Sequence, residues 1–224
     1  MDISAALAAL GKRSRGIKPK ARYHFIHIPK NGGYSVRTAL KRRGDVSVSE
    51  PFHFRYVDIA HKVGADLQFF CIVRNPWSRT ASRYQFAIQN SKSWSANDPR
   101  RVYITKANFE DYVKDQRIFP IPEHPEQPWM GPMNSWFNQL EWIRDEDNNI
   151  VCDCLRFEHL QQDLNQYLGG KVRLRRENAT QARYDYRNMY TDELAEIIAT
   201  TFEDDIRHFG FTFDGAATRN VATL

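Results

Sequence analysis

The sequence has little of what marks a secreted, membrane-spanning or metal-binding protein. Only three of its 224 residues are cysteine, Cys71, Cys152 and Cys154, and their odd number and Cys-x-Cys spacing favour neither a disulfide framework nor a zinc site. No run approaches the roughly 18 apolar residues of a membrane span. The basic residues near the N-terminus follow the apolar segment 3–10, whereas a secretory signal has them before it. We therefore expect no membrane span, and buried free thiols in a reducing cytoplasm.

The sequence also has only a small excess of positive over negative charge. The chain has 32 Lys+Arg against 27 Asp+Glu, a formal net charge of +5. A scattered excess of this size favours anionic ligands, but it falls short of the clustered charge of a nucleic-acid-binding protein. His24, His124, His159 and His208 have no cysteine or carboxylate partners at metal-ligand spacing. The sequence therefore predicts neither a nucleic-acid partner nor a metal site.

Apolar strand-like runs alternate with helical patterns along the chain. We predict strands at 23–28, 67–73 and 150–157. We predict helices at 33–43, 77–89, 108–117, 134–144 and 191–208, and a further helix that follows the third strand and ends at 168. This alternation indicates a single α/β domain with a central parallel sheet flanked by helices. The domain is expected at 21–215, after an N-terminal extension, 1–20, and before a C-terminal tail, 216–224. Residues 90–132 contain no strong strand pattern and are expected to form an acceptor-binding or lid insertion.

The most informative pattern follows the first predicted strand. Pro29 and Lys30 precede Gly32 and Gly33, and a helical pattern starts at the glycines. Glycines let the main chain approach a ligand closely, and a helix N-terminus directs unpaired N–H groups and a positive dipole end at it. The lysine precedes the glycines, whereas in G-x-x-x-x-G-K-[ST] it follows them. The pattern predicts a phosphate-like ligand without requiring nucleoside triphosphate cleavage.

A second basic turn follows the strand predicted at 67–73. Arg74 stands at the end of that strand, and Ser82 lies about two helical turns later. If the turn folds Arg74 back towards the helix, a guanidinium and a hydroxyl converge on one anion, which suits phosphate. Ligands of parallel sheets bind at the carboxyl ends of the strands, where both turns are expected. We therefore expect one ligand with two separated phosphate-like groups.

Together the two motifs resemble the sulfotransferase family that uses 3′-phosphoadenosine 5′-phosphosulfate (PAPS). Residues 29–36, Pro-Lys-Asn-Gly-Gly-Tyr-Ser-Val, resemble its 5′-phosphosulfate loop, P-K-[TS]-G-[TG]-[TS]-x-L. Residues 74–84 resemble its 3′-phosphate motif, R-[DN]-P-x-x-R-x-x-S-x-Y. Residues 155–160 are similar to the family's strand-to-helix turn, R-[FY]-E-x-L. Asn178, Thr180 and the helix that ends at 205–211 look like the C-terminal part of its Golgi-type and bacterial carbohydrate branch. The resemblance covers 23–213 and implies a P-loop-containing nucleotide-hydrolase-like sulfotransferase fold.

The resemblance also implies a ligand and roles for residues. PAPS would be the co-substrate and 3′,5′-adenosine bisphosphate (PAP) the product, with no metal. Lys30 would contact the bridging oxygen and neutralise charge as the sulfuryl group leaves. The remaining nucleotide contacts would come from Asn31, Gly32, Gly33, Tyr34, Ser35 and Val36 in the loop, from Arg74 and Ser82 at the 3′-phosphate, and from Asn178 and Thr180. Asn31 and Tyr34 stand where the family often has threonine.

A sulfuryl transfer also requires a base, because the acceptor hydroxyl loses its proton as it attacks in line. Related carbohydrate sulfotransferases have a histidine or glutamate base in the interval after the first helix. In that interval His53 is our first candidate, Glu50 the second and His61 the third. His27, which alternates with Phe25 in the predicted strand, is expected to be structural.

The leading hypothesis is therefore transfer of a sulfuryl group from PAPS to an acceptor hydroxyl, on a glycan or glycolipid. One alternative is a nucleotide or small-molecule kinase with a degenerate phosphate loop, which would need Mg²⁺. The other is a non-catalytic nucleotide-binding module that lacks a base. Activity with ATP would favour the kinase, and binding of PAP without transfer would favour the binding module.

Overall fold

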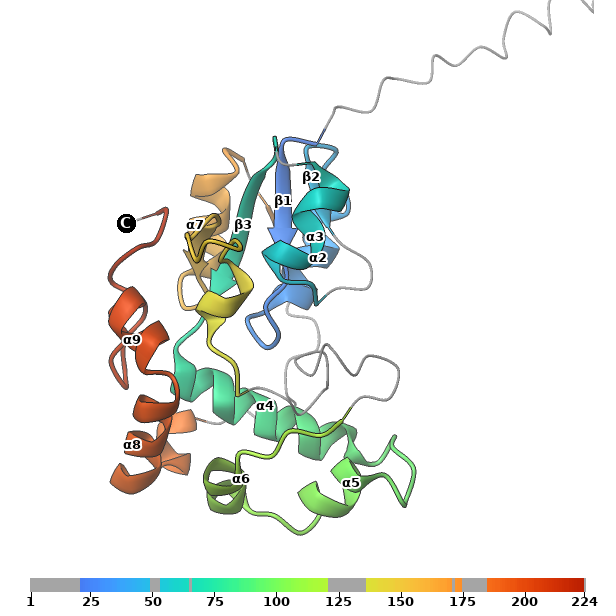
Figure 1. The fold of residues 1–224 in the computed structure, drawn as a ribbon, viewed down its shortest axis with the longest axis vertical. Coiled ribbons are helices and arrows are strands. Elements are labelled where there is room, and N and C mark those ends of the chain that lie inside the picture. The colour runs from blue at the N-terminus through green and yellow to red at the C-terminus, as the bar shows by residue number, and fades with distance from the viewer. Residues whose placement is uncertain are drawn as a thin grey trace, which may run out of the picture.

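The computed structural model describes residues 21–48, 53–64, 66–120, 136–170, 172–174 and 185–223. Its strands and helices alternate in the first half of the chain (Figure 1). The elements are β1 (Tyr23–Ile26), α2 (Gly33–Leu40), β2 (Val46–Val48), α3 (Tyr56–Val63), β3 (Gln68–Val73), α4 (Pro76–Ser91), α5 (Pro99–Ile104), α6 (Phe109–Asp115), β4 (Asp153–Arg156), α7 (Leu160–Tyr167), α8 (Asp192–Thr201), α9 (Glu203–Phe209) and the 3₁₀ helices η2 (Gln139–Trp142) and η3 (Tyr186–Met189).

The four strands form one parallel sheet in the order β2-β1-β3-β4. The predicted α/β class and the parallel sheet are thus confirmed. The chain leaves β1 towards β2 on one side and returns to β3 on the other. The carboxyl ends of β1 and β3 therefore flank the point where the strand order reverses, which is where open α/β sheets bind ligands.

Helices cover both faces of the sheet, because alternate residues of each strand point to opposite sides. Phe70 and Ile72 of β3 pack in one cluster with residues of α2 and α7. Phe69, Cys71 and Val73 pack in the other with residues of α3, α4, α6, α8 and α9. In Figure 1, α4 crosses below the strands, and α5 and α6 lie on its far side.

Two of the predicted helices are wrong. The described part of 134–144 contains only the 3₁₀ helix η2, because the main-chain N–H groups of Gln139 and Leu140 bond to the Asp205 carboxylate instead of continuing a helix. The helix predicted at 191–208 is two helices, α8 and α9, that meet at Phe202. The Thr201 hydroxyl donates to Ile197 O at 2.8 Å near that junction, a contact that tends to bend helices.

Residues 216–223, which the sequence assigns to a tail, pack against the domain. Ala217 is 2 % exposed and belongs to the larger core cluster. The Ala222 N–H donates to Cys154 O at 2.9 Å, and Arg156 Nη2 donates to Thr223 O at 2.9 Å. The end of the described chain therefore lies along β4.

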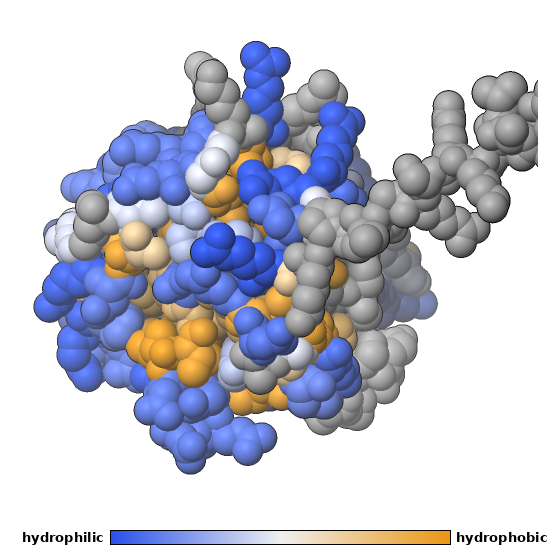
Figure 2. Space-filling model, turned by 90° about the horizontal axis from the view of Figure 1, so that it is seen from above, coloured by the Kyte–Doolittle hydropathy of each residue, from blue (hydrophilic) through white to orange (hydrophobic). Residues whose placement is uncertain are grey.

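The surface viewed in Figure 2 is mostly hydrophilic, and hydrophobic residues appear there as separate patches. Within the described ranges, every helix is too short or too polar to cross a lipid bilayer. The side chains of Cys71, Cys152 and Cys154 are buried free thiols, as predicted.

Candidate functional site

The first turn of the site is the loop between β1 and α2. Lys30 and Gly32 both have left-handed main-chain conformations, with φ of 68° and 74°. Such a conformation is easy for glycine and strained for lysine, so the surrounding structure must hold Lys30 in place. Gly32 is the N-cap of α2, and no side chain caps the helix there. The first N–H groups of α2 therefore point out of the helix end, as an anion site requires.

The residues after Gly32 line this loop in different ways. A Cβ on Gly33 would lie 1.9 Å from His27 Cδ2, so only glycine fits beneath that imidazole. Tyr34 is exposed and Ser35 is partly buried, whereas Val36 is 0 % exposed in the core. Val36 can therefore contribute only main-chain atoms to a ligand.

The Asn31 side chain points into the protein. Its Nδ2 donates to Ile72 O at 2.6 Å and to Gln139 Oε1 at 2.7 Å, and the residue is 0 % exposed. Asn31 thus ties the loop to the end of β3. Only its main chain remains for the ligand contact that the sequence assigns to it.

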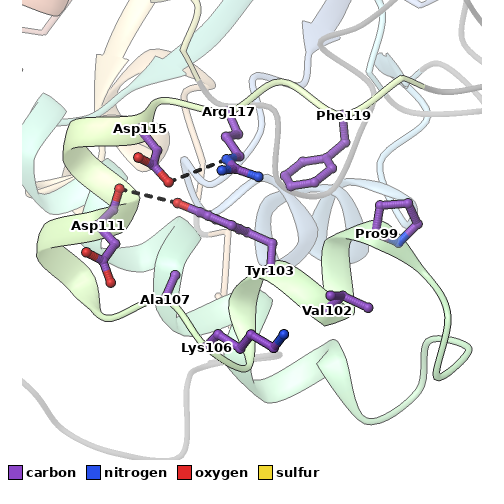
Figure 3. A pocket seen from close by; sticks show the side chains of 9 residues that line it. All are labelled: Pro99, Val102, Tyr103, Lys106, Ala107, Asp111, Asp115, Arg117 and Phe119. Carbon is purple, nitrogen blue, oxygen red and sulfur yellow. Dashed lines mark hydrogen bonds and ion pairs between the residues drawn. The ribbon is translucent and has the colours of Figure 1, made fainter.

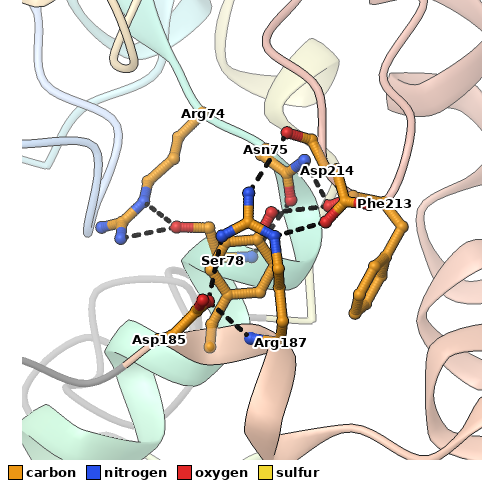
Figure 4. Close-up of polar contacts among 8 residues, drawn as sticks. Arg74, Asn75, Ser78, Asp185, Arg187, Phe213 and Asp214 are labelled. Carbon is orange, nitrogen blue, oxygen red and sulfur yellow. Dashed lines mark hydrogen bonds and ion pairs between the residues drawn. The ribbon is translucent and has the colours of Figure 1, made fainter.

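The second turn, between β3 and α4, lies directly beside the first. Arg74 Nη1 donates to Lys30 O at 2.9 Å, while its Nε and Nη2 donate to Ser78 Oγ at 3.0 and 2.8 Å. Its guanidinium lies over the Phe157 ring, 4.0 Å from the ring centroid. Arg74 does fold back onto α4 (Figure 4), but onto Ser78. Ser82, which the sequence assigns to the same anion as Arg74, is buried on this helix one turn further along.

Asn75 and Arg187 organise the rim of this turn (Figure 4). Asn75 caps α4 by accepting from Ser78 N at 3.1 Å, and its Nδ2 donates to three carbonyls of residues 212–215. Arg187 of η3 pairs with Asp185 at 3.0 Å and with Asp214. Two carboxylates thus balance the charge of Arg187, so this arginine is a poor candidate for binding a phosphate.

Lys30 carries its charge in a hydrophobic setting. Its Nζ lies 4.1 Å from the centroid of the Phe86 ring of α4. Burial, followed by the nearby cations Arg83 and Arg74, lowers the pKa of Lys30 to about 7. No carboxylate in the described ranges forms an ion pair with Lys30. A cluster of cations around a buried amine is the environment that an anion would stabilise.

His53 lies at this cluster, and His27 lies beside it. The two imidazole rings are 4.8 Å apart, edge to face. Burial lowers the pKa of His53 well below its ordinary value, and the nearby His27, Arg83, Arg37 and Lys30 lower it further. Burial likewise lowers the pKa of His27, to about 3. Both rings are therefore neutral near pH 7.

The structure brings together most of the residues that the sequence singled out. Lys30, Arg74 and His53 meet around the loop, whereas His61 is exposed on α3. Glu50, Asn178 and Thr180 lie outside the described residues. In the described ranges, no group of three or more His, Cys, Asp or Glu side chains could hold a metal ion.

Sequence reasoning did not assign Phe86 of α4 or Gln139 of η2 to this site. Phe86 lies on the face of α4 that carries Arg79 and Arg83, and that helical spacing could have been read from the sequence. Arg79 is buried and donates to Pro29 O at 3.3 Å and to Phe137 O at 3.0 Å, so it supports the loop. Gln139 had no local signal, because its partners are distant in sequence.

The insertion expected at 90–132 is described as far as Pro120 and contains α5 and α6. A cavity of about 470 Å³ lies between these helices (Figure 3). It is lined by Pro99, Val102, Tyr103, Lys106, Ala107, Asp111, Asp115, Arg117 and Phe119. Arg117 stacks on the Tyr103 ring at 4.7 Å and pairs with Asp115 at 3.4 Å.

No protein-family model matches the chain, and no curated protein matches it either. The resemblance to PAPS-dependent sulfotransferases thus rests on the residues of the two turns and on their geometry.

Proposed function

We propose that this chain is a PAPS-dependent sulfotransferase that transfers a sulfuryl group to an acceptor hydroxyl, on a P-loop-like sulfotransferase fold. The observation that carries the proposal is the hydrogen bond from Arg74 to Lys30 O, 2.9 Å long. It joins the two basic turns at the point of the parallel sheet where ligands bind. One ligand with two phosphate-like groups suits such a pair of turns better than a single anion does.

In this proposal each turn holds one end of the nucleotide. The N-terminus of α2 and the Lys30 ammonium bind the 5′-phosphosulfate, and Arg74 with the hydroxyls of Ser78 and Ser82 binds the 3′-phosphate. Ser78 joins the predicted pair because Arg74 already contacts it. Phe157, beneath the Arg74 guanidinium, holds that side chain flat.

The reaction follows from these positions. The acceptor oxygen attacks sulfur in line with the bond to the bridging oxygen, and that bond breaks with its electron pair going to the phosphate of PAP. Lys30 stabilises the charge that develops there. The acceptor proton goes to His53, whose imidazole is neutral in the folded protein. A phosphosulfate bound among the cations would raise the pKa of His53, because opposite charge favours the imidazolium.

The resemblance suggests a carbohydrate as acceptor, on a glycan or glycolipid. The cavity between α5 and α6, with its aromatic rings and charged groups, belongs to the segment that the sequence assigns to acceptor binding. The proposal includes a reducing, cytoplasmic setting, which the three buried free thiols support.

The test is transfer of radiolabelled sulfate from PAPS to a panel of glycans, glycolipids and small alcohols. We expect a labelled product with the unmodified chain, and loss of labelling with His53→Ala but not with Glu50→Ala. His208→Ala, at the end of α9, is the matched histidine control. Turnover with ATP that a chelator abolishes would instead favour the kinase, and PAP binding without any transfer would favour the binding module.

A further inference from the structure

The side chain of Gln139 meets both anion-binding turns. It is 0 % exposed, and its Oε1 accepts from Asn31 Nδ2 at 2.7 Å and from the Arg74 main-chain N–H at 2.9 Å. Its Nε2 donates to Arg74 O at 3.0 Å and to Asp205 Oδ2 at 3.1 Å. All four hydrogen-bonding positions of the carboxamide are filled.

These partners fix the orientation of the amide. The main-chain N–H and C=O of Arg74 cannot exchange roles, so the reversed amide would place donor against donor and acceptor against acceptor. Gln139 therefore pairs with Arg74 as a neighbouring strand would, and it holds Asn31 of the other turn with the same oxygen. Burial strengthens each bond and makes its loss costly.

Asp205 of α9 in turn fixes the main chain and the side-chain amide of Gln139. Asp205 Oδ2 accepts from the Gln139 main-chain N–H at 2.7 Å, and its Oδ1 accepts from Leu140 N at 3.0 Å. Asp205 is 0 % exposed, and Arg79 is a nearby counter-charge for it. Because Arg79 also bonds to Pro29 O, the Lys30 loop and the Arg74 turn are tied to the same buried network.

We propose that Gln139 is a positioning residue that sets the spacing between the Lys30 loop and the Arg74 turn. Gln139 thereby makes the site selective for a nucleotide with both a 5′ and a 3′ anionic group over a nucleotide with one. A ligand that engages two sites gains from the second only where their spacing is held, because otherwise binding must also order the protein. The inference rests on the proposed function only for the identity of the ligand.

The test compares three ligands, PAP, adenosine 5′-phosphate and adenosine 3′-phosphate, by titration calorimetry. With Gln139→Met, which keeps the size but not the hydrogen bonds, we expect the affinity for PAP to fall about tenfold or more. The affinities for the two monophosphates should change by less than about threefold, since each needs only one turn. The matched control is Gln68→Met, at the other end of β3, where Gln68 contacts Asp153 and neither turn.

Asn31→Ala provides a second test if Gln139→Met does not fold, because it removes the Asn31 bonds to Gln139 and to Ile72 O but leaves the pairing of Gln139 with Arg74 in place. The same loss, confined to PAP, would support the proposal. An equal loss for all three ligands, or no loss for PAP, would overturn it. A wild-type chain that does not bind PAP would overturn the proposed function as well, so the two failures are distinguishable.

Discussion

Lys30 combines three features that rarely occur together in one lysine. Its main chain is left-handed, its ammonium lies on the Phe86 ring, and the cations Arg83 and Arg74 lie near it. The left-handed main chain and the neighbouring cations each carry a cost in the ligand-free protein, whereas the contact with Phe86 is favourable. Strain of this kind is typical of functional sites, where it places a group before the ligand arrives.

The low pKa of Lys30 predicts how binding depends on pH. Below about 7 the amine is already protonated, whereas above it a bound anion must raise the pKa again and draw in a proton. The affinity for PAP should therefore fall as pH rises from about 7 to about 9, by up to tenfold per pH unit. Calorimetry at about pH 8 in buffers of different ionisation enthalpy should show proton uptake on binding. Equal affinities across this range, or no uptake, would contradict the assignment; Lys30→Met should remove both effects.

The close packing of Gly33 against His27 leads to a second prediction at the residue scale. A methyl group there would overlap His27 Cδ2 and Nε2, at 1.9 and 2.1 Å. Gly33→Ala should therefore lower the free energy of unfolding by about 1–3 kcal/mol, as overpacking does. Urea denaturation measures this. The double variant His27→Ala/Gly33→Ala should regain part of the loss relative to His27→Ala alone, and strict additivity of the two changes would count against the contact.

Among the elements, α4 does most to position the site. Its N-terminus follows Arg74, its Ser78 accepts from Arg74, and its Arg79 supports the Lys30 loop. Its Phe86 lies under the Lys30 ammonium. The helix is held at its start by Asn75, which joins it to residues 212–215.

Asn75 should therefore matter more than an ordinary N-cap. Asn75→Ala removes the cap of α4 and the amide that donates to the carbonyls of Thr212, Phe213 and Gly215. The free energy of unfolding should fall by about 2–4 kcal/mol. The matched control is Asn108→Ala at α6, where loss of an exposed capping box should lower the free energy of unfolding by about 1 kcal/mol. Urea denaturation of both variants decides, and equal losses would mean that the contacts to 212–215 contribute nothing.

The sequence predicted elements well where the pattern was local. The pattern of 67–73 predicts a strand, and the structure has one from Gln68 to Val73. The helix predicted from 191 begins there, where the Thr191 hydroxyl accepts from Leu194 N. Prediction failed where distant residues decide. Phe202 ends α8 although the apolar face continues, and η2 is shaped by Asp205, which lies 66 residues from Gln139.

The site shows the same division. Lys30, Gly32 and Gly33 could be found because a loop between a strand and a helix carries its own signal. Arg74 and Ser82 could be singled out by their spacing, whereas the contact of Arg74 with Ser78 became visible only in the fold. Gln139 could not be found at all, since its role depends on contacts with Asn31 and Arg74 that exist only in the fold.

The C-terminal segment packs along β4, at the edge of the sheet. Ala222 and Thr223 bond to Cys154 and Arg156 of β4, and Ala217 is buried. Deletion of 216–224 should therefore lower the free energy of unfolding by at least about 2 kcal/mol, since two hydrogen bonds and buried apolar area are lost. Thermal and urea unfolding measure the change, and unaltered stability would contradict this packing.

For the whole molecule, the strand order determines where the two basic turns lie. Both basic turns leave the carboxyl ends of β1 and β3, which are neighbours in the sheet. The site thus depends on the register of two strands as well as on the residues of two loops. The central claim is that this junction holds PAPS with Lys30 at the bond that breaks.

The most direct test of that claim is a single-turnover measurement of labelled sulfate transfer at saturating PAPS, with Lys30→Ala beside the unmodified chain. We predict that the variant, once saturated with PAPS, transfers sulfate about 10²–10³-fold more slowly, because Lys30 stabilises charge that develops during transfer. Transfer at the normal rate by Lys30→Ala would contradict the account.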